Sequence, residues 1–427
     1  MDFSVLPSVD QLLGRLALPP GRFPHSLIVE EIRRAVAAAR EELRAGRNPA
    51  PLEATVRAAL EDWEQPSLER VINATGVVLH TNLGRAPLAP FTPIDGYSNL
   101  EYDLTQGRRG KRDLHYSHLL NHLLNTPAIA VNNNAAATYL VLNELAAGHE
   151  VIVSRGELIE IGDGFRIPDI MERSGAILRE VGTTNRTTLD DYRRAITPHT
   201  KLILRVHPSN FHVSGFTQKP SLRELTTLGV PVYEDLGSGC LVDLRPHGID
   251  EPLVSESLAA GIALVSFSCD KLLGGPQTGI IAGDGTLVER CRRNPMYRAF
   301  RPDKLIVQAL EHTLRLLLLE RYDDIPALRM LRLTPAILRQ RAEAFAALVP
   351  GATVREGHSV AGGGSTPDQT LPAWLVSLPG PAHQLERKLR AHTPPIVARI
   401  ESDSVVIDLR TVSPADEPLI VAALAMA

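Results

Sequence analysis

The chain has 427 residues, of which 44% are hydrophobic and 22% charged, and its formal net charge is −4 at pH 7. These values are ordinary for a globular protein of two or three domains, and they give no global electrostatic case for nucleic-acid binding. Its three cysteines include no CxxC pair, which argues against a disulfide framework or a zinc site and favours a cytoplasmic location. No apolar run approaches the ~20 residues of a membrane span, so we expect no membrane association.

Residues 1–65 are predicted to form a small helical module. Ser8 is a plausible helix cap because Gln11 follows three residues later, as in a capping box. Residues 27–45 carry apolar side chains at helical spacing among charges, and a further helix is expected over 52–63. Ten acidic and eight basic side chains give this module no basic surface overall.

Residues 66–300 show short apolar runs that alternate with helical patterns. The expected strands are Ala128–Val131, Val151–Ser154, Ile177–Val181, Leu202–Val206, Val230–Glu234, Ile262–Phe267 and Thr278–Ala282. Such runs are typical of a mainly parallel, seven-stranded sheet that is covered by helices on both faces. The remaining residues, 301–427, are expected to form a long helix over 305–321 and then a small α+β domain.

A lysine follows one of these strands, in a turn of small residues. Ser268 and the glycines at 274 and 275 flank Lys271 and permit a ligand to approach the backbone closely. A lysine on a turn is usually only a solvated charge. In this context we expect Lys271 to form a Schiff base with pyridoxal 5′-phosphate and Ser268 to donate to the cofactor phosphate.

Two further segments fit the same cofactor. Asp235 ends a strand, where open α/β sheets bind ligands, and its carboxylate would keep the pyridine nitrogen protonated. Without Lys271, a simple turn acid would be the better interpretation. Asn133, Asn134 and Ala135 lie where a strand leads into a helix, so they would cap that helix and its free N–H groups would bind the phosphate.

Two arginines are candidates for binding an anion. Arg298 and Arg301 lie three residues apart, a spacing that places two side chains on one helix face, where they would clamp an oxyanion. The ordinary alternative is that these arginines are solvent-exposed charges that keep the protein soluble. The histidines at 115, 118 and 122 have a metal-like spacing, but no carboxylate motif accompanies them, so a solvated or packed face is the better interpretation and no metal is expected.

Several long motifs resemble those of the bacterial selenocysteine synthases, the L-seryl-tRNA(Sec) selenium transferases. They are Val71–Ala86 (VINATGVVLHTNLGRA), Asn99–Leu104 (NLEYDL), Ser154–Gly162 (SRGELIEIG), Val181–Thr187 (VGTTNRT), Asp235–Gly239 (DLGSG) and Asp270–Gln277 (DKLLGGPQ). The similarity extends over nearly the whole chain. One departure is Cys269, which stands where the family usually has glycine.

The resemblance implies a fold-type-I pyridoxal-phosphate transferase that assembles as a homo-oligomeric ring of dimers. It implies that Lys271 is the Schiff-base lysine and Asp270 its neighbouring acid. It also implies that Arg85, Arg298 and Arg301 bind the phosphate of selenophosphate. Finally, it implies that the N-terminal module binds tRNA.

By the same resemblance, the reaction converts seryl-tRNA(Sec) to selenocysteinyl-tRNA(Sec) through a cofactor-bound dehydroalanyl intermediate. Two alternatives stay open. One is a pyridoxal-phosphate ammonia-lyase that acts on a small amino sugar or amino acid, although such an enzyme does not need the N-terminal module. The other is a non-catalytic tRNA-binding protein with a vestigial cofactor site.

Overall fold

The computed structural model describes residues 6–161, 164–208, 211, 213–363 and 369–425. The chain divides into two compact units, residues 1–70 and 71–427. The N-terminal unit has three helices: α1 (Val9–Leu16), α2 (His25–Arg44) and α3 (Leu52–Asp62). Ser8 and Gln11 form the predicted capping box, in which the Ser8 hydroxyl accepts from the Gln11 backbone. The three helices bury their own small core, which includes Leu12, Ile32 and Val56.

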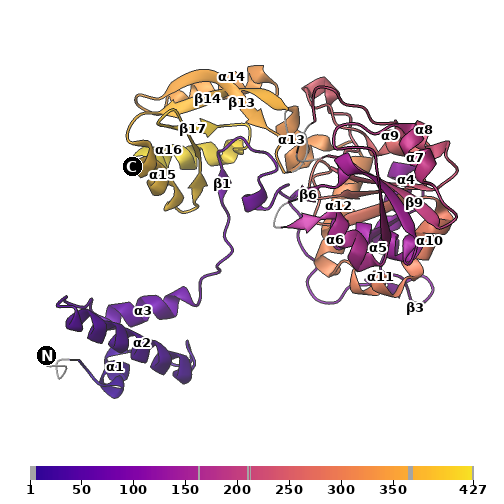
Figure 1. The fold of residues 1–427 in the computed structure, drawn as a ribbon. Coiled ribbons are helices and arrows are strands. Elements are labelled where there is room, and N and C mark those ends of the chain that lie inside the picture. The colour runs from indigo at the N-terminus through magenta and orange to yellow at the C-terminus, as the bar shows by residue number, and fades with distance from the viewer. Residues whose placement is uncertain (1–5, 162–163, 209–210, 212, 364–368, 426–427) are drawn as a thin grey trace. The chain divides into compact units, whose positions relative to one another are not determined.

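Residues 128–283 of the larger unit contain a seven-stranded sheet with helices packed around it (Figure 1). Its strands, in spatial order, are β4 (Ala128–Val131), β12 (Gly279–Gly283), β11 (Leu264–Ser268), β10 (Val232–Gly237), β9 (Thr200–Val206), β5 (Glu150–Ser154) and β8 (Ile177–Val181). Six of these strands run in the same direction, and β12 runs in the opposite direction. The predicted mainly parallel sheet is therefore confirmed. Six of the expected strands lie within two residues of their observed bounds, and β10 ends three residues beyond the predicted end, at Gly237.

Both faces of this sheet are buried, which explains why its strands are continuous apolar runs. In β4, Ala128 and Ala130 pack in one core, whereas Ile129 and Val131 pack in the other. The first core also takes side chains from α4 (Leu114–Leu124), α7 (Leu189–Ala195), α8 (Leu222–Thr226), α9 (Val254–Ala259) and α12 (Lys304–Leu318). The second takes side chains from α5 (Asn134–Ala146), α6 (Ile167–Ser174) and α10 (Gly285–Arg293).

The small domain is built on an antiparallel sheet in the order β13 (Thr353–Val360), β14 (Thr370–Leu378), β17 (Ser404–Asp408) and β16 (Arg399–Glu401). Its helices are α14 (Pro335–Ala346), α15 (Ala382–Arg390) and α16 (Glu417–Ala425), and α13 (Pro326–Arg332) precedes them. The long helix α12 ends at Leu318, three residues before the predicted end. Residues early in the chain also join this domain, since β1 (Ile72–Asn73) pairs with β15 (Ile396–Val397) and Ile72 lies in its core.

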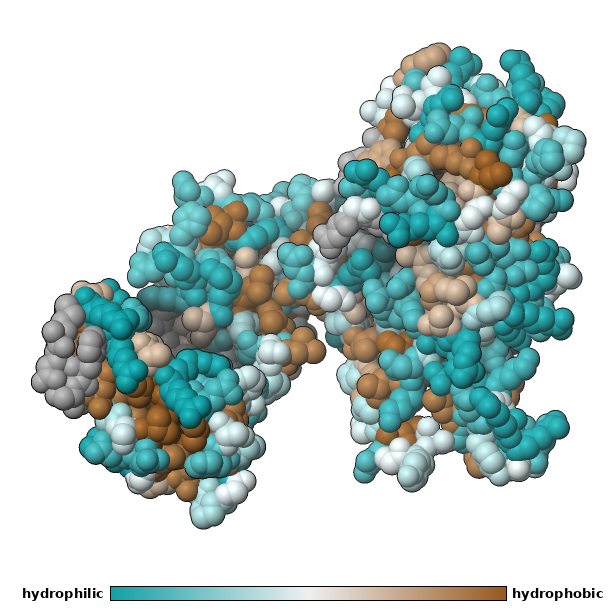
Figure 2. Space-filling model, turned by 60° about the horizontal axis from the view of Figure 1, so that its bottom comes forward, coloured by the Kyte–Doolittle hydropathy of each residue, from teal (hydrophilic) through white to brown (hydrophobic). Residues whose placement is uncertain are grey.

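Short elements complete the larger unit. They are η2 (Thr81–Leu83), β2 (Tyr102–Asp103), β3 (Arg108–Arg109), η3 (Arg155–Glu157), β6 (Glu160–Ile161), β7 (Phe165–Arg166), η4 (Arg245–His247), α11 (Pro295–Ala299), η5 (Tyr322–Asp324) and η6 (Pro414–Asp416). The face in Figure 2 is mostly hydrophilic, with separate apolar patches. Among the described helices, none combines the length and the apolar character that crossing a membrane requires.

Candidate active site

The carboxyl ends of β4, β10 and β11 lie at one edge of the sheet. β4 and β11 are both antiparallel to β12, so they run parallel to each other, and β10 is parallel to β11. A cavity of about 230 Å³ lies among the segments that follow these strands. Its lining residues are Arg85, Asn133, Asn134, Ala135, Val206, His207, Asp235, Gly237, Ser268, Lys271 and Gln277. The edge is the position at which open α/β sheets bind ligands.

Lys271 lies three residues beyond β11 and is only 7% exposed. The backbone around it is fixed, because Cys269 N donates to Thr278 O at 2.8 Å and Leu272 N donates to Ser238 O at 3.1 Å. Burial lowers the pKa of Lys271, and the nearby Arg85 guanidinium lowers it further. A lowered pKa makes the neutral amine more available, as a lysine that attacks an aldehyde requires.

Asp235 lies on β10 and is 6% exposed. Its carboxylate accepts hydrogen bonds from Asn134 Nδ2 at 2.7 Å and from Thr138 Oγ1 at 3.0 Å. Burial raises the pKa of Asp235, while these two donors and the charge of Lys271 act in the opposite direction. Asp235 and Lys271 therefore face one cavity as a buried acid and a buried base.

The turn between β4 and α5 supplies backbone donors. Asn133 caps α5, and its side-chain oxygen accepts from Ala136 N at 2.8 Å. Unpaired N–H groups in the first turn of a helix attract anions. The turn lies close against β12, because a Cβ atom added at Gly279 would meet the Asn133 carbonyl oxygen at 2.2 Å. A glycine at 279 is thus required for the position of the turn.

Asp270 links the lysine turn to Arg85. Ser268 Oγ donates to Asp270 Oδ1 at 2.5 Å, and Arg85 Nη1 donates to Asp270 Oδ2 at 2.7 Å. The Asp270 carbonyl also accepts from Ala86 N at 3.2 Å. In this arrangement the Ser268 hydroxyl donates to a carboxylate, whereas the sequence predicted that it would donate to a cofactor phosphate.

Arg298 and Arg301 line a different hollow, of about 410 Å³, to which Arg85 does not contribute. The premise that they share a helix face is wrong, because α11 ends at Ala299, before Arg301. Arg301 instead pairs with Glu101 at 3.2 Å. The hollow is basic, since Arg109, Lys111, Arg112, Arg292 and Arg293 also line it, beside the acids Glu101, Asp113 and Glu289.

The histidines at metal-like spacing lie on α4. The ring of His115 contacts the Leu100 carbonyl at 3.1 Å, and the ring of His118 contacts the Leu114 carbonyl at 3.1 Å. His122 is exposed. Within the ranges that the structure describes, no group of three or more metal-ligating side chains is found.

Sequence reasoning assigned no role to four of the residues that line the cavity, Val206, His207, Gly237 and Gln277. His207 directly follows β9, and its backbone N donates to Asp235 O at 2.9 Å. Its place at the carboxyl end of a predicted strand was the signal that would have identified it. Gln277 lies in the turn before β12, and its one sequence signal was its place at the end of the Asp270–Gln277 motif.

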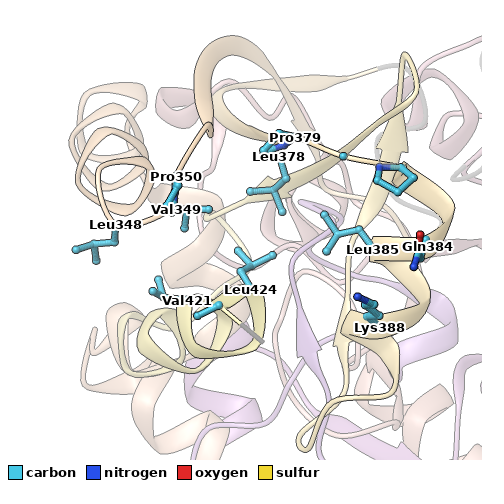
Figure 3. A pocket seen from close by; sticks show the side chains of 13 residues that line it. Leu348, Val349, Pro350, Leu378, Pro379, Gln384, Leu385, Lys388, Val421 and Leu424 are labelled. Carbon is cyan, nitrogen blue, oxygen red and sulfur yellow. The ribbon is translucent and has the colours of Figure 1, made fainter. Parts of the chain in front are cut away.

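A larger hollow, of about 630 Å³, lies in the small domain (Figure 3). Its lining is mostly apolar and includes Leu348, Leu385 and Leu424, and Lys388 is the one charged residue among those that line it. It offers no pair of acid and base, in contrast to the Lys271 cavity. We therefore assign the chemistry to the smaller cavity.

The Lys271 cavity fits pyridoxal phosphate. It combines a buried amine, a buried carboxylate and a helix N-terminus, which are the groups that bind the cofactor's aldehyde, ring nitrogen and phosphate. Moreover, Asn134 lines the cavity, and its buried Oδ1 atom has no hydrogen-bond partner in the part of the chain that the structure describes. Buried polar atoms without partners are uncommon and are expected where a ligand belongs.

Fold and site together define a fold-type-I pyridoxal-phosphate enzyme. Residues 71–413 match the model of the L-seryl-tRNA selenium transferase family, and residues 3–40 match that of the selenocysteine synthase N-terminal region. The chain belongs to the L-seryl-tRNA selenium transferase family. It is 44% identical to the L-seryl-tRNA(Sec) selenium transferase of Aquifex aeolicus, over 96% of each chain, and 45% identical to that of Geobacter sulfurreducens, over 99% of this chain and 98% of the other.

Among solved structures, a D-glucosaminate-6-phosphate ammonia-lyase is similar with a TM-score of 0.59. The match covers 85% of this chain and 96% of the lyase, at 20% sequence identity. This similarity shows the shared fold and does not bear on the substrate.

Gly279 gives a test of how the cavity is built. We expect Gly279→Ala to displace the Asn133 turn, to destabilise the fold by about 1–3 kcal/mol and to weaken pyridoxal-phosphate binding. The matched control is Gly285→Ala, whose Cβ would meet only Pro127 Cγ, at 3.4 Å. Absorbance titration with the cofactor and chemical denaturation measure the two effects. Unchanged cofactor affinity in Gly279→Ala would show that the turn is not part of the site.

Proposed function

We propose that this protein converts seryl-tRNA(Sec) to selenocysteinyl-tRNA(Sec), with selenophosphate as the selenium donor. The observation that carries the proposal is a sequence identity of 44%, over nearly the whole length, to relatives whose names state this activity. The Lys271 cavity supports it, because its residues fit the cofactor that the chemistry requires. The three cysteines are buried free thiols, which agrees with a reaction in the cytoplasm.

Each cavity residue has a role in this proposal. When bound, pyridoxal phosphate supplies an electron sink that acidifies the Cα–H bond of the seryl group. Lys271 holds the cofactor, and its Nζ atom then takes the Cα proton once the substrate amine has replaced it. Asp235 would pair with the ring nitrogen of the bound cofactor, and its carboxylate would keep that nitrogen protonated. Asn133, Asn134 and Ala135 bind the phosphate through the first turn of α5.

Asp270 and Ser268 form hydrogen bonds that hold the turn around Lys271 and the side chain of Arg85 in place. We propose that Asp270 holds Arg85 at the rim of the cavity through their 2.7 Å contact. Ser268 is 4% exposed and donates to the same carboxylate, and it also lines the cavity beside the proposed phosphate position. The seryl hydroxyl leaves with the Cα proton as water. The selenium of selenophosphate then bonds to the β-carbon, a proton returns to Cα, and water cleaves the Se–P bond and releases phosphate.

The decisive assay is product analysis. The purified protein, loaded with pyridoxal phosphate, is incubated with seryl-tRNA(Sec) and selenophosphate, and the amino acid is then released from the tRNA. We expect selenocysteine from the unaltered protein and only serine from Lys271→Ala, which keeps the cavity but lacks the amine. Unchanged serine together with ammonia release from a small amine would indicate an ammonia-lyase. Tight tRNA binding without any turnover would indicate a non-catalytic binding protein.

We propose that Arg298 and Arg301 bind the phosphate of selenophosphate together with Arg85. In one chain the pair and Arg85 line separate hollows, so a second copy of the chain would have to bring them to one anion. This requirement agrees with the homo-oligomeric ring of dimers that the family resemblance implies. Sedimentation of the purified protein tests it, because a monomer at working concentration would contradict the proposal.

Arg298→Ala and Arg301→Ala should each raise the half-saturating selenophosphate concentration by roughly 10- to 150-fold. This range corresponds to one hydrogen bond to a charged group, about 1.5–3 kcal/mol. Cofactor affinity and loss of the seryl hydroxyl should persist, since both precede selenium delivery. Arg193→Ala on α7 is the control, because Arg193 is exposed and pairs with Asp190 of the same helix. A loss of cofactor binding with unchanged selenophosphate affinity would refute this role.

The N-terminal unit is the proposed tRNA-binding module. The arginines expected to meet the tRNA phosphates are Arg33, Arg34, Arg40 and Arg44, and all four are exposed on α2. Arg33, Arg40 and Arg44 recur at intervals of seven and four residues, which places them on one face, whereas Arg34 pairs with Glu31 at 3.0 Å. Because acids outnumber bases in residues 1–65, affinity would have to come from such a local cluster opposed to phosphates.

A shortened protein that begins at Val71 should bind pyridoxal phosphate normally yet fail to retain seryl-tRNA(Sec) in a gel shift. We expect this because the unit from 71 to 427 contains the whole cofactor cavity. The double variant Arg33→Ala, Arg40→Ala of the full chain should weaken tRNA binding and flatten its salt dependence. If the shortened protein retains the tRNA as well as the full chain does at the same salt, the module has another role.

A further inference from the structure

A buried carboxyl group lies beside the Lys271 cavity and has no role in the mechanism above. Glu251 lies just before α9 and is 3% exposed. Its Oε1 atom lies 3.8 Å from Nδ1 of His207, a side chain that lines the cavity. Ser238, which is completely buried, is the third member of this group, and its carbonyl accepts from the backbone N of the residue after Lys271.

The three polar side chains lack hydrogen bonds in the part of the chain that the structure describes. His207 Nδ1, Glu251 Oε1 and Ser238 Oγ are all buried, and none makes a hydrogen bond of standard geometry there. Ser238 is nevertheless close enough to Glu251 to act as a donor that lowers the pKa of the carboxyl. Buried polar atoms without partners are costly, so three of them side by side indicate that they pair with one another through small side-chain rotations.

The surrounding charges determine which group carries hydrogen. Burial lowers the pKa of His207 to about 4, and the positive charges of Lys219, Arg205 and Lys271 act in the same direction. The imidazole is therefore neutral near neutral pH and carries one hydrogen, on either Nδ1 or Nε2.

Glu251 is subject to opposing influences. The net effect is a raised pKa, because burial outweighs the lowering by Ser238 and by the charge of Lys271, and Asp250 raises the pKa further. Of its neighbours, Lys271 supplies the positive charge that favours the ionised carboxylate, and Ser238 supplies a donor to it. An ionised carboxylate can only accept hydrogen bonds, so a contact with His207 requires the imidazole hydrogen on Nδ1.

We propose that Glu251 is a positioning residue that accepts a hydrogen bond from Nδ1 of His207 and thereby fixes the tautomer of that ring. Ser238 donates to the same carboxylate and holds it in place. With its hydrogen on Nδ1, His207 has Nε2 as a hydrogen-bond acceptor, a role that the other tautomer lacks. The proposal depends on the proposed function only in that the ring lines the cavity assigned to the cofactor.

The direct test is solid-state ¹⁵N NMR of the cofactor-free full chain, labelled at histidine. The chain has 14 histidines, so the His207 signals are identified by their loss in His207→Gln. We expect the Nδ1–H tautomer in the unaltered protein and in Ser238→Ala, which keeps Glu251. Glu251→Leu should lose this preference. An Nε2–H tautomer in the unaltered protein overturns the proposal even if Glu251→Leu does not fold, and so does an unchanged tautomer in a folded Glu251→Leu.

Cofactor affinity gives a second readout. Glu251→Leu should bind pyridoxal phosphate about two- to tenfold more weakly, as the loss of one net hydrogen bond predicts, and unchanged affinity would contradict a role toward the cavity. Neither measurement uses tRNA or selenophosphate. An enzyme that fails to make selenocysteine would therefore leave both results intact, whereas an active enzyme with the other His207 tautomer would overturn this inference alone.

Discussion

Two opposite charges, Lys271 and Asp235, are buried at the carboxyl edge of one sheet, and most of the local structure serves to hold them there. Burial of an ionisable group destabilises its charged form unless other groups stabilise the charge. Asn134 and Thr138 do so for Asp235, and Asp270, which ties Arg85 to the lysine turn, is one of the acids whose charge favours protonated Lys271. The net effect is a lowered pKa for Lys271, which makes its neutral amine more available, and a raised pKa for Asp235.

The topology explains why these groups meet although they are distant in sequence. Asn134, Asp235 and Lys271 lie at or just beyond the carboxyl ends of β4, β10 and β11, and antiparallel β12 brings β4 next to that part of the sheet. The close approach of the Asn133 turn to Gly279 on β12 fixes the distance between the proposed phosphate site and the lysine turn. A substitution in β12 at Gly279 would therefore displace the residues that are proposed to bind the cofactor.

The strands and the main site residues were predictable because both follow from local sequence. Parallel strands buried on two faces are continuous apolar runs, and ligand groups follow their carboxyl ends. The role of Ser268 toward Asp270 was not predictable, because it depends on a rotamer. Arg301 was placed on a helix that ends two residues earlier, and its true partner, Glu101, lies 200 residues away in sequence. Glu251 was missed for the same reason, since only the fold brings it to His207.

The central claim is that Lys271 is the residue that holds pyridoxal phosphate. Borohydride reduction of the cofactor-loaded protein, followed by proteolysis and mass spectrometry, tests it most directly, because reduction fixes the cofactor on the lysine to which it is bound. The account predicts a single modified peptide that contains Lys271, and no labelled peptide in the Lys271→Ala variant. A label on another lysine, such as Lys219, whose pKa is affected by the charge of Arg205, would contradict the account.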